Sequence, residues 1–309
     1  MLKKLIVKII EWILSPVINR LNQIIRRLDR IDLNIDSVQQ SLGRIENRQL
    51  EANTNRPIND FEYKVYSQWG EDGIIQYLIR NVTIQVPIFV EFGIEDYKEA
   101  NTRFLLTNNN WSGLVIDCNS ESITRFKTDR IYWQYNIKAI NEYIRRDNIN
   151  QILIGNGVEG EIGLLSIDID GNDYWIWDAI NVIQPIIVVI EYNYRFGQDL
   201  AVTIPYSDYF DHSTAHSSQI YYGASLRALH ILAEHKGYDF IGCCNDGVNA
   251  FFIRKDRRPP NIKVVTIEEG YRAGNHSEIR DKGGNIIKTT PIEEMNYLLT
   301  QNLPLIYIE

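Results

Sequence analysis

Acidic residues end four of the apolar runs in the second part of this sequence. Glu91, Asp117, Asp168 and Glu191 each lie at the end of such a run, and Asp170 follows two residues after Asp168. Gathered carboxylates can hold a cation, bind ligand hydroxyl groups, or take the proton of a hydroxyl nucleophile. These residues therefore predict one ligand site, provided that the fold brings the ends of the runs to a common edge.

The order of the expected elements predicts such a fold. Beyond residue 57, strand-like runs alternate with helical patterns, which is typical of a parallel sheet with crossover helices. The expected strands are 87–92, 113–117, 131–138, 162–168 and 185–191, then an antiparallel pair at 238–244 and 248–254. The expected helices are 71–81, 99–108, 120–127, 140–154, 173–181 and 225–236. We therefore expect an α/β fold, a doubly wound, mostly parallel Rossmann-like sheet with an antiparallel edge strand, whose ligands bind beyond the carboxyl ends of the strands.

The turn after the first expected strand restricts the ligand. It has one glycine, Gly93, followed by the acids Glu95 and Asp96, whereas a dinucleotide fingerprint has glycines at three set places. Acids would repel a pyrophosphate, so NAD and nucleoside triphosphates are disfavoured. S-adenosylmethionine instead carries a sulfonium and an ammonium, and its ribose diol needs a carboxylate at the end of the second strand, where Asp117 lies. The residues therefore favour this cofactor.

The charge is unevenly distributed along the chain. Ten basic and six acidic residues give residues 1–56 a charge of +4, so the remainder of a chain whose total charge is −8 carries −12. An acidic body argues against nucleic acid as a partner. Three cysteines, of which Cys243 and Cys244 are adjacent, do not suit a disulfide framework. We therefore expect a reduced, cytoplasmic protein.

The first fifty residues show a heptad repeat. From Ile10 to Ile45 the apolar residues are spaced alternately four and three apart. Leucine dominates one core position, while isoleucine or valine fills the other, a combination that disfavours two-stranded packing. We predict a homo-oligomer, a trimer or tetramer, formed through residues 10–49. The alternative is a single surface helix packed on its own domain.

Residues 2–14 combine an apolar helical face with three lysines. No uncharged run approaches the ~20 residues that a membrane span needs, and no small-residue cleavage site follows. The pattern suits a short interfacial helix on anionic lipid that ends near Ser15 and Pro16, which would place the protein at the inner face of the membrane. The alternative is that this face extends the core of the oligomer.

Several motifs occur in order over roughly residues 62–255. They are Ser67–Gly73 (SQWGEDG), Val90–Gly93 (VEFG), Glu99–Thr102 (EANT), Trp111–Asp117 (WSGLVID), Leu165–Tyr174 (LSIDIDGNDY), Gly223–Leu226 (GASL), Lys236–Tyr238 (KGY) and Asn249–Phe252 (NAFF). Together they resemble the FkbM-like class I S-adenosylmethionine-dependent methyltransferases, many of which look like products of polysaccharide gene clusters. The resemblance implies transfer of a methyl group from S-adenosylmethionine to an oxygen, often on a sugar or a polyketide.

The resemblance also implies roles for single residues. Glu91 and Gly93 would line the methionine end of the cofactor, Asp117 would hold the ribose, and Asp168 would face the sulfonium. Residues 136–139 would border the adenine. The cofactor-binding residues that we expect are Gln68, Glu91, Gly93, Asn101, Thr102, Asp117, Asn136 and Asp168.

The acceptor must lose a proton, and carboxylates lie where it would meet the sulfonium. We expect Asp170 and Glu191 to activate the acceptor, with His216 as a reserve base. The alternative is that Asp168, Asp170 and Glu191 hold Mg²⁺, which prefers carboxylate oxygens. Residues 194–222 are rich in tyrosine, serine and acids, a composition that suits a carbohydrate acceptor.

The predicted organisation has three parts: a helical arm with its linker (1–56), a Rossmann-like methyltransferase domain (57–256), and a C-terminal extension packed on that domain (257–309). The predicted function is O-methylation of a sugar or other hydroxyl, in surface polysaccharide biosynthesis. The alternative is a non-catalytic oligomeric scaffold that keeps the methyltransferase fold.

Overall fold

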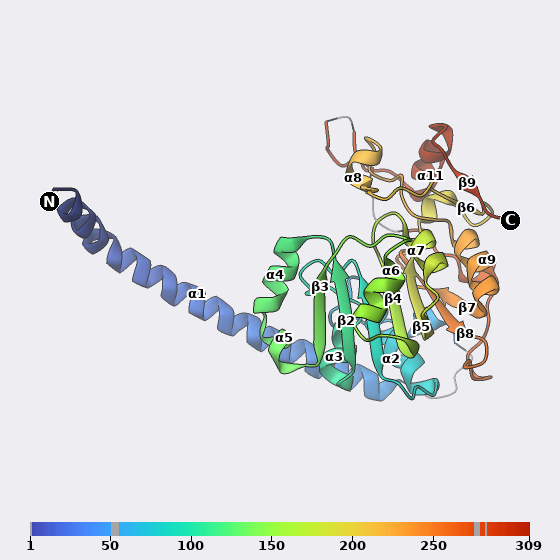
Figure 1. The fold of residues 1–309 in the computed structure, drawn as a ribbon, viewed down its shortest axis with the longest axis horizontal. Helices are drawn as coiled ribbons and strands as arrows, with labels where there is room; N and C mark the ends of the chain where they lie inside the picture. The colour runs from blue at the N-terminus through green and yellow to red at the C-terminus, as the bar shows by residue number, and fades with distance from the viewer. Residues whose placement is uncertain (1, 51–55, 275–278, 282) are drawn as a thin grey trace. The chain divides into compact units, whose positions relative to one another are not determined.

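A seven-stranded sheet forms the centre of the second part of the chain (Figure 1). The computed structural model describes residues 2–50, 56–274, 279–281 and 283–309, and it divides into two compact units, Met1–Ile45 and Glu46–Glu309. The sheet consists of β1 (Ile88–Phe92), β2 (Ser112–Asp117), β3 (Ile137–Asn141), β4 (Gly160–Ile167), β5 (Ile183–Glu191), β7 (Tyr238–Cys243) and β8 (Asn249–Arg254).

The strand order is β3-β2-β1-β4-β5-β8-β7. The first five strands are parallel, whereas β8 pairs antiparallel with β5, and β7 pairs antiparallel with β8. The predicted fold class is therefore confirmed: a doubly wound, mostly parallel sheet with a reversed edge. The chain leaves β1 toward β2 on one side and returns to β4 on the other, so the order reverses between β1 and β4, where such sheets bind ligands.

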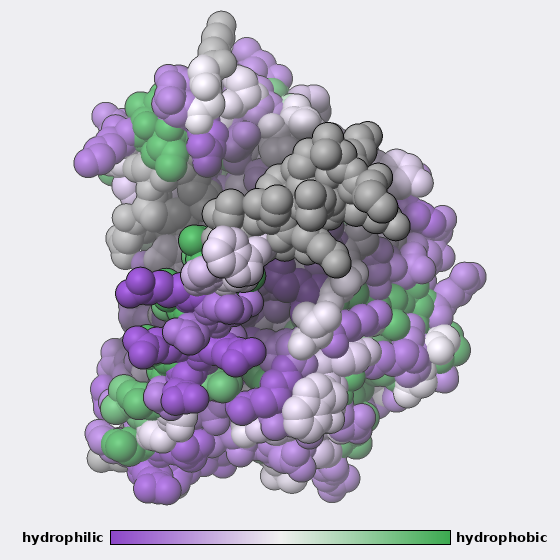
Figure 2. Space-filling model, turned by 90° about the vertical axis from the view of Figure 1, so that its left-hand side faces the viewer, coloured by the Kyte–Doolittle hydropathy of each residue, from purple (hydrophilic) through white to green (hydrophobic). Residues whose placement is uncertain are grey.

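Helices cover both faces of the sheet. One face packs against α2 (Glu71–Asn81), α3 (Arg103–Asn109) and α4 (Ser120–Thr128), and the other against α6 (Ile149–Gly155), α7 (Asp173–Ala179) and α9 (Leu226–Lys236). Side chains alternate between the two cores, as a strand period of two requires: Phe89 packs on the first face, and Val90 and Phe92 on the second. The surface seen in Figure 2 is, by contrast, mostly hydrophilic.

One predicted strand is wrong. Residues 130–134 form a short helix, α5 (Arg130–Gln134), and β3 begins only at Ile137. The reason is an N-cap, because Asp129 Oδ1 accepts the Ile131 N–H at 2.9 Å and so favours a helical turn. The displaced strand extends to Asn141, and for that reason α6 begins at Ile149 rather than at residue 140.

The C-terminal segment builds a second, smaller core with the segment that follows β5. It holds α10 (Ile267–Gly270), α11 (Pro291–Thr300) and β9 (Ile306–Tyr307), and β9 pairs with β6 (Val202–Thr203). An ion pair anchors it, because Arg195 Nε lies 2.6 Å from Glu294 Oε2 with both side chains only 1% exposed. The shared apolar residues are Phe196, Val202, Ile204, Ile220, Tyr221, Ile279 and Leu298.

The N-terminal helix α1 (Leu2–Gln49) does not end at Ser15 and Pro16, so the expected short helix is wrong in its boundary. Pro16 lacks the N–H that would bond to the Trp12 carbonyl, but Ser15 Oγ donates to that carbonyl at 3.0 Å. The Trp12 carbonyl therefore still accepts a hydrogen bond, and the helix continues past Pro16. Among the described residues, no helix is both long and apolar enough to cross a membrane. Residues 51–55 of the expected linker lie outside the described part of the chain.

The apolar heptad positions of α1 are exposed in the single chain. From Leu14 to Ile45 their side chains are between 45% and 57% exposed. A stripe of this length in water is unfavourable unless another surface covers it, and a second copy offers the same spacing.

We expect the stripe to mediate self-association. Leu21→Glu with Leu28→Glu places charges in the proposed core, so the molar mass in light scattering should fall from a trimer or tetramer to a monomer. Asn22→Glu with Gln23→Glu adds the same charge outside the heptad core and should leave the mass unchanged. A monomeric parent protein, or an oligomer that both double variants preserve, would contradict the heptad interpretation.

Candidate functional site

A cavity of about 870 Å³ opens at the carboxyl ends of the central strands. All four strand-end acids line it: Glu91 from β1, Asp117 from β2, Asp168 after β4, and Glu191 from β5. The segment that carries α8 (His212–Ala215) faces this edge of the sheet (Figure 1), and Asp211 and His212 from it also line the cavity. The fold thus brings the four acids at the predicted strand ends together in one cavity.

The turn after β1 requires glycine. Gly93 has φ +73°, and a Cβ there would lie 1.5 Å from the backbone oxygen of Asp168. The Gly93 N–H donates to the Ile116 carbonyl at 3.1 Å, so the turn is tied to β2 as well. Gly93 therefore lets β1, β2 and the end of β4 approach closely at the floor of the cavity.

Glu91 organises the loop that precedes α3. Its carboxylate accepts the N–H of Asn101 at 2.8 Å, the N–H of Thr102 at 3.2 Å, and the hydroxyl of Thr102. Burial raises the pKa of Glu91 to about 7, although these hydrogen bonds oppose the rise. Glu91 and Asn101 line the cavity, as does the exposed Gln68, whereas Thr102 is buried behind Glu91 and does not line it. The two amides that bind this carboxylate immediately precede helix α3, which starts at Arg103.

Asp117 is held in place by two backbone amides. Its Oδ2 accepts the Glu95 N–H at 2.8 Å, and its Oδ1 accepts the Asn119 N–H at 2.7 Å. Glu95 is thereby fixed at φ 46°, a left-handed conformation that costs a non-glycine residue about 1–2 kcal/mol. Each carboxylate oxygen has a second lone pair, so Asp117 can still accept hydrogen bonds from two neighbouring ligand hydroxyls.

Asp168, Asp170 and Glu191 form a carboxylate cluster. One oxygen from each lies within 4.8 Å of the others. Glu191 is buried, Asp168 is half-buried at the floor of the cavity, and Asp170 is exposed. Desolvation raises the pKa of Asp168 well above its ordinary value, and the neighbouring Asp170 carboxylate raises it further. The cluster therefore favours a proton, an organic cation or a metal ion at Asp168.

The loop that presents this cluster is tied down by a fourth acid. Asp173, the first residue of α7, accepts the Ile169 N–H and the Gly171 N–H, each at 2.9 Å. It is fully buried, and burial raises its pKa to about 6. These bonds hold Asp170 at φ 53° over the cavity. Asp173 thus serves the local backbone.

Besides Thr102, two further predicted site residues do not line the cavity. Asn136 precedes β3 and bonds to Ser112 Oγ at 2.8 Å, at the opposite edge of the sheet, because the real strand begins where the expected one ended. His216 does not line the cavity, since its Nδ1 is 2.7 Å from Ser218 Oγ and its ring packs near Tyr297. His212 does line the cavity, with Nδ1 3.8 Å from Asp170 Oδ2.

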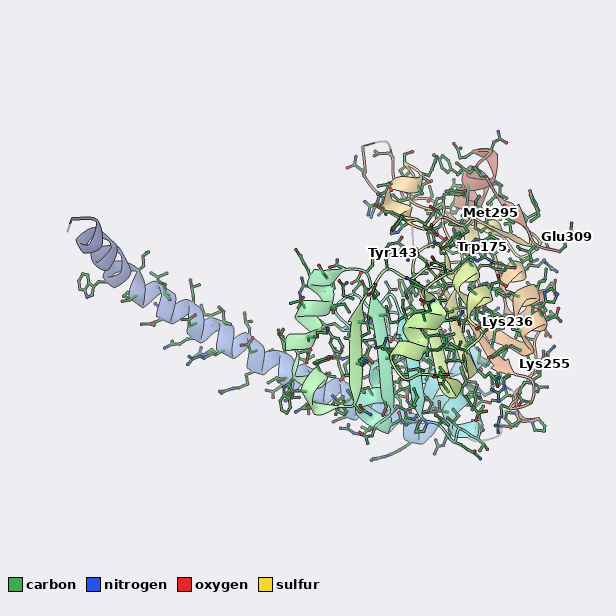
Figure 3. All side chains as sticks on the ribbon, viewed as in Figure 1. Tyr143, Trp175, Lys236, Lys255, Met295 and Glu309 are labelled. Atoms are coloured by element: carbon green, nitrogen blue, oxygen red, sulfur yellow. The ribbon has the colours of Figure 1, made fainter. Side chains whose placement is uncertain are left out.

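Sequence reasoning missed the residues that follow the true end of β3. Glu142 and Tyr143 line the cavity, and Tyr143 (Figure 3) donates from its hydroxyl to the Phe210 carbonyl at 2.7 Å. The Asp129 N-cap was the available signal, because it shifts the strand and hence its end. Asn249, which is opposite Glu191 in the β5–β8 register, also lines the cavity, and only tertiary pairing brings it there.

Comparison with known proteins gives a likeness of fold. An S-adenosylmethionine-dependent methyltransferase from Clostridium acetobutylicum is 11% identical over 59% of this chain and 89% of its own, with a TM-score of 0.37. The N-terminal domain of EvdMO1, solved in the presence of SAH and D-fucose, is 10% identical over 71% and 96%, with a TM-score of 0.40. A putative caffeoyl-CoA O-methyltransferase from Staphylococcus aureus is 13% identical over 60% and 82%, with a TM-score of 0.38. No family model and no curated protein matches the chain.

The raised pKa of Glu91 predicts how stability depends on pH. Between pH 4.5 and about 7 the folded protein keeps a proton on Glu91 that the unfolded chain has released, so folding takes up a proton. Stability should therefore fall as pH rises through this window, and Asp173 adds to the fall. Thermal unfolding followed by circular dichroism at several pH values measures this dependence of stability on pH. Glu91→Gln should flatten the slope, and Glu121→Gln on the exposed surface of α4 should keep it. A slope of unchanged steepness in Glu91→Gln would show that Glu91 does not titrate in this way.

Proposed function

We propose that this protein is an S-adenosylmethionine-dependent methyltransferase of the kind that its motifs resemble, the FkbM-like enzymes, and that it methylates a hydroxyl oxygen of a sugar. The observation that carries the proposal is the placement of Asp117 and Asp168 in one cavity, on either side of the tight Gly93 turn. One carboxylate is positioned for a diol, and the other lies where a cation would be stabilised.

Asp117 suits the ribose. Its two backbone hydrogen bonds fix the carboxylate before a ligand arrives, so little conformational entropy is lost on binding. Hydrogen bonds to a charged acceptor contribute about 1.5–3 kcal/mol each when they are made. The loop after Asp117, which includes Cys118 and Asn119, also lines the cavity and would lie beside the nucleoside.

Asp168 suits the sulfonium. Desolvation raises the pKa of Asp168, and the carboxylates of Asp170 and Asp173 raise it further, so its ionised form is costly without a cation. A fixed positive charge next to it would relieve this cost and keep the carboxylate ionised. When bound, S-adenosylmethionine supplies an electrophilic methyl group. The protein's contribution is then to place the acceptor oxygen in line with the methyl carbon and the sulfur.

Asp170 and Glu191 are positioned to take the acceptor's proton. Methyl transfer to a hydroxyl oxygen would leave the electron pair of the broken carbon–sulfur bond on sulfur and release the hydroxyl proton, which Asp170 or Glu191 would accept. General-base assistance of this kind contributes about 10²–10⁴-fold. His212, which faces Asp170, takes the reserve role that the sequence gave to His216.

A metal-dependent version of the same reaction remains a second candidate. The three carboxylates of Asp168, Asp170 and Glu191 offer the hard oxygen ligands that Mg²⁺ prefers. A bound Mg²⁺ would lower the pKa of the acceptor hydroxyl, and Asp168 would then face the metal rather than the sulfonium. A non-catalytic scaffold is the remaining alternative, and it predicts no cofactor binding at all.

We further propose that the protein works in the cytoplasm in surface polysaccharide biosynthesis, and that it does so as a trimer or tetramer. Residues 2–14 would bring it to the inner face of the membrane if their apolar face binds lipid rather than other copies. Binding to anionic vesicles that falls with salt would support the lipid role.

Loss of the Asp117 carboxylate should weaken the cofactor site. We expect Asp117→Ala to lower the affinity for S-adenosylhomocysteine by ~10-fold or more, because two hydroxyls lose a charged acceptor. Isothermal titration calorimetry on the full-length protein measures it. Asp199→Ala, an exposed acid outside the cavity, is the control and should bind as the parent does. No saturable binding to the folded parent would favour the scaffold alternative.

Asp168 should distinguish the charged cofactor from its neutral product. S-adenosylmethionine has a sulfonium that S-adenosylhomocysteine lacks, so Asp168→Asn should reduce affinity for the former by ~10-fold and for the latter much less. Titrations with both ligands, in EDTA and in Mg²⁺, give the ratio of the affinity for S-adenosylmethionine to that for S-adenosylhomocysteine. If the metal version holds, the ratio should change with Mg²⁺ in the parent but not in Asp168→Asn. An equal loss for both ligands in both buffers would remove Asp168 from the sulfonium site.

A further inference from the structure

The walls of the cavity carry a strong excess of negative charge. Nine of the described lining residues are carboxylates, against one guanidinium, Arg280, and one imidazole, His212. Even without Glu91 and Asp168, whose pKa values are raised, seven carboxylates remain. They come from β2, from β5, from the loops after β1, β3 and β4, and from the segment before α8. Glu99 is paired with Lys64 at 3.0 Å, and a bound S-adenosylmethionine, with a net charge of about +1, would leave most of the remaining charge uncompensated.

Aromatic rings lie at the rim of the same cavity. The side chain of Tyr209 is 73% exposed although it lines the cavity, and its ring centre is 5.4 Å from that of Tyr143. Tyr143 is fixed by its hydrogen bond to the Phe210 carbonyl, so it supports Tyr209 from one side. An exposed large aromatic ring beside a polar cavity is typical of a binding surface, because it offers a flat apolar face at little cost in conformational entropy.

We propose that the acceptor is a saccharide chain without carboxylate or phosphate groups, one sugar of which stacks on Tyr209 while its neighbour extends a hydroxyl toward Asp170 and Glu191. The inference rests on the proposed function, which supplies the reason for a hydroxyl to reach the cluster. Sugar rings combine an apolar face with hydroxyls that carboxylates accept, so they match both features of the cavity. The unbalanced carboxylates admit neutral or amine-bearing sugars and repel anionic ones.

The negative charge of the cavity also disfavours other ligands that have flat rings. A nucleotide sugar or a single-stranded nucleic acid would stack on tyrosine equally well, but each phosphate would meet carboxylates with Arg280 as the one guanidinium among the described lining residues. The carboxylates would repel any uronic acid or phosphorylated sugar. This discrimination against anionic sugars does not depend on a residue that contacts the accepted sugar.

Three hexasaccharides of similar length test the proposal: maltohexaose, which is neutral, a glucosamine hexamer, which bears amines, and a galacturonate hexamer, which bears carboxylates. Each is titrated into the full-length protein saturated with S-adenosylhomocysteine, and binding is followed by saturation-transfer NMR. We expect binding of the neutral or the amine-bearing chain and none of the galacturonate chain. Tyr209→Ala should weaken that binding by ~5–10-fold, a loss of about 1–1.4 kcal/mol.

Tyr307→Ala is the matched control, since Tyr307 is 69% exposed in β9 and does not line the cavity. Galacturonate binding as tight as the others, no binding of any hexasaccharide, or indifference to Tyr209→Ala would each overturn the inference. Calorimetry with S-adenosylhomocysteine alone separates the two proposals. Cofactor binding without saccharide binding refutes only the inference, whereas Tyr209-dependent saccharide binding without cofactor binding refutes only the methyltransferase function.

Discussion

Buried carboxylates that accept backbone N–H groups hold the carboxyl edge of the sheet together. Asp72 accepts three consecutive amides, from Val65 to Ser67, at 2.6–2.8 Å, and Glu91 and Asp173 each accept two more. An amide left unpaired in such a place would cost about 1–3 kcal/mol. The loops at this edge can therefore be irregular and still buried, and each of them presents its side chains to one cavity.

This way of building the edge has an electrostatic consequence. Glu91 lines the cavity together with Asp117, Asp170 and Glu191, whereas Asp72 and Asp173 are buried and do not line it. Burial raises the pKa of Asp72 to about 6 and that of Glu91 to about 7. The edge that these residues stabilise therefore consists largely of acids, and its cavity has one arginine and one histidine among the described lining residues.

The outer wall of the cavity depends on a different interaction. The segment after β5 returns over the sheet, and the buried pair between Arg195 and Glu294 fixes it to α11 nearly one hundred residues later in the chain. Tyr194 donates to the same carboxylate at 2.8 Å, so the charge of Glu294 is well compensated despite its burial. This wall places Tyr209 and His212 over the strand ends.

The sequence by itself determined the sheet, its reversed edge, the four strand-end acids and the heptad spacing of the first helix, because periodicity and strand-end residues are local signals. It placed Asn136 and His216 in the site wrongly. The N-cap at Asp129 shifts the start of β3 past Asn136, and the loop of His216 has no hydrophobic periodicity from which its position could be predicted. Only the tertiary structure decided that Glu91 binds a loop and that Asn249 and Tyr209 reach the cavity. Those placements depend on pairing and burial between residues distant in sequence, which no local pattern encodes.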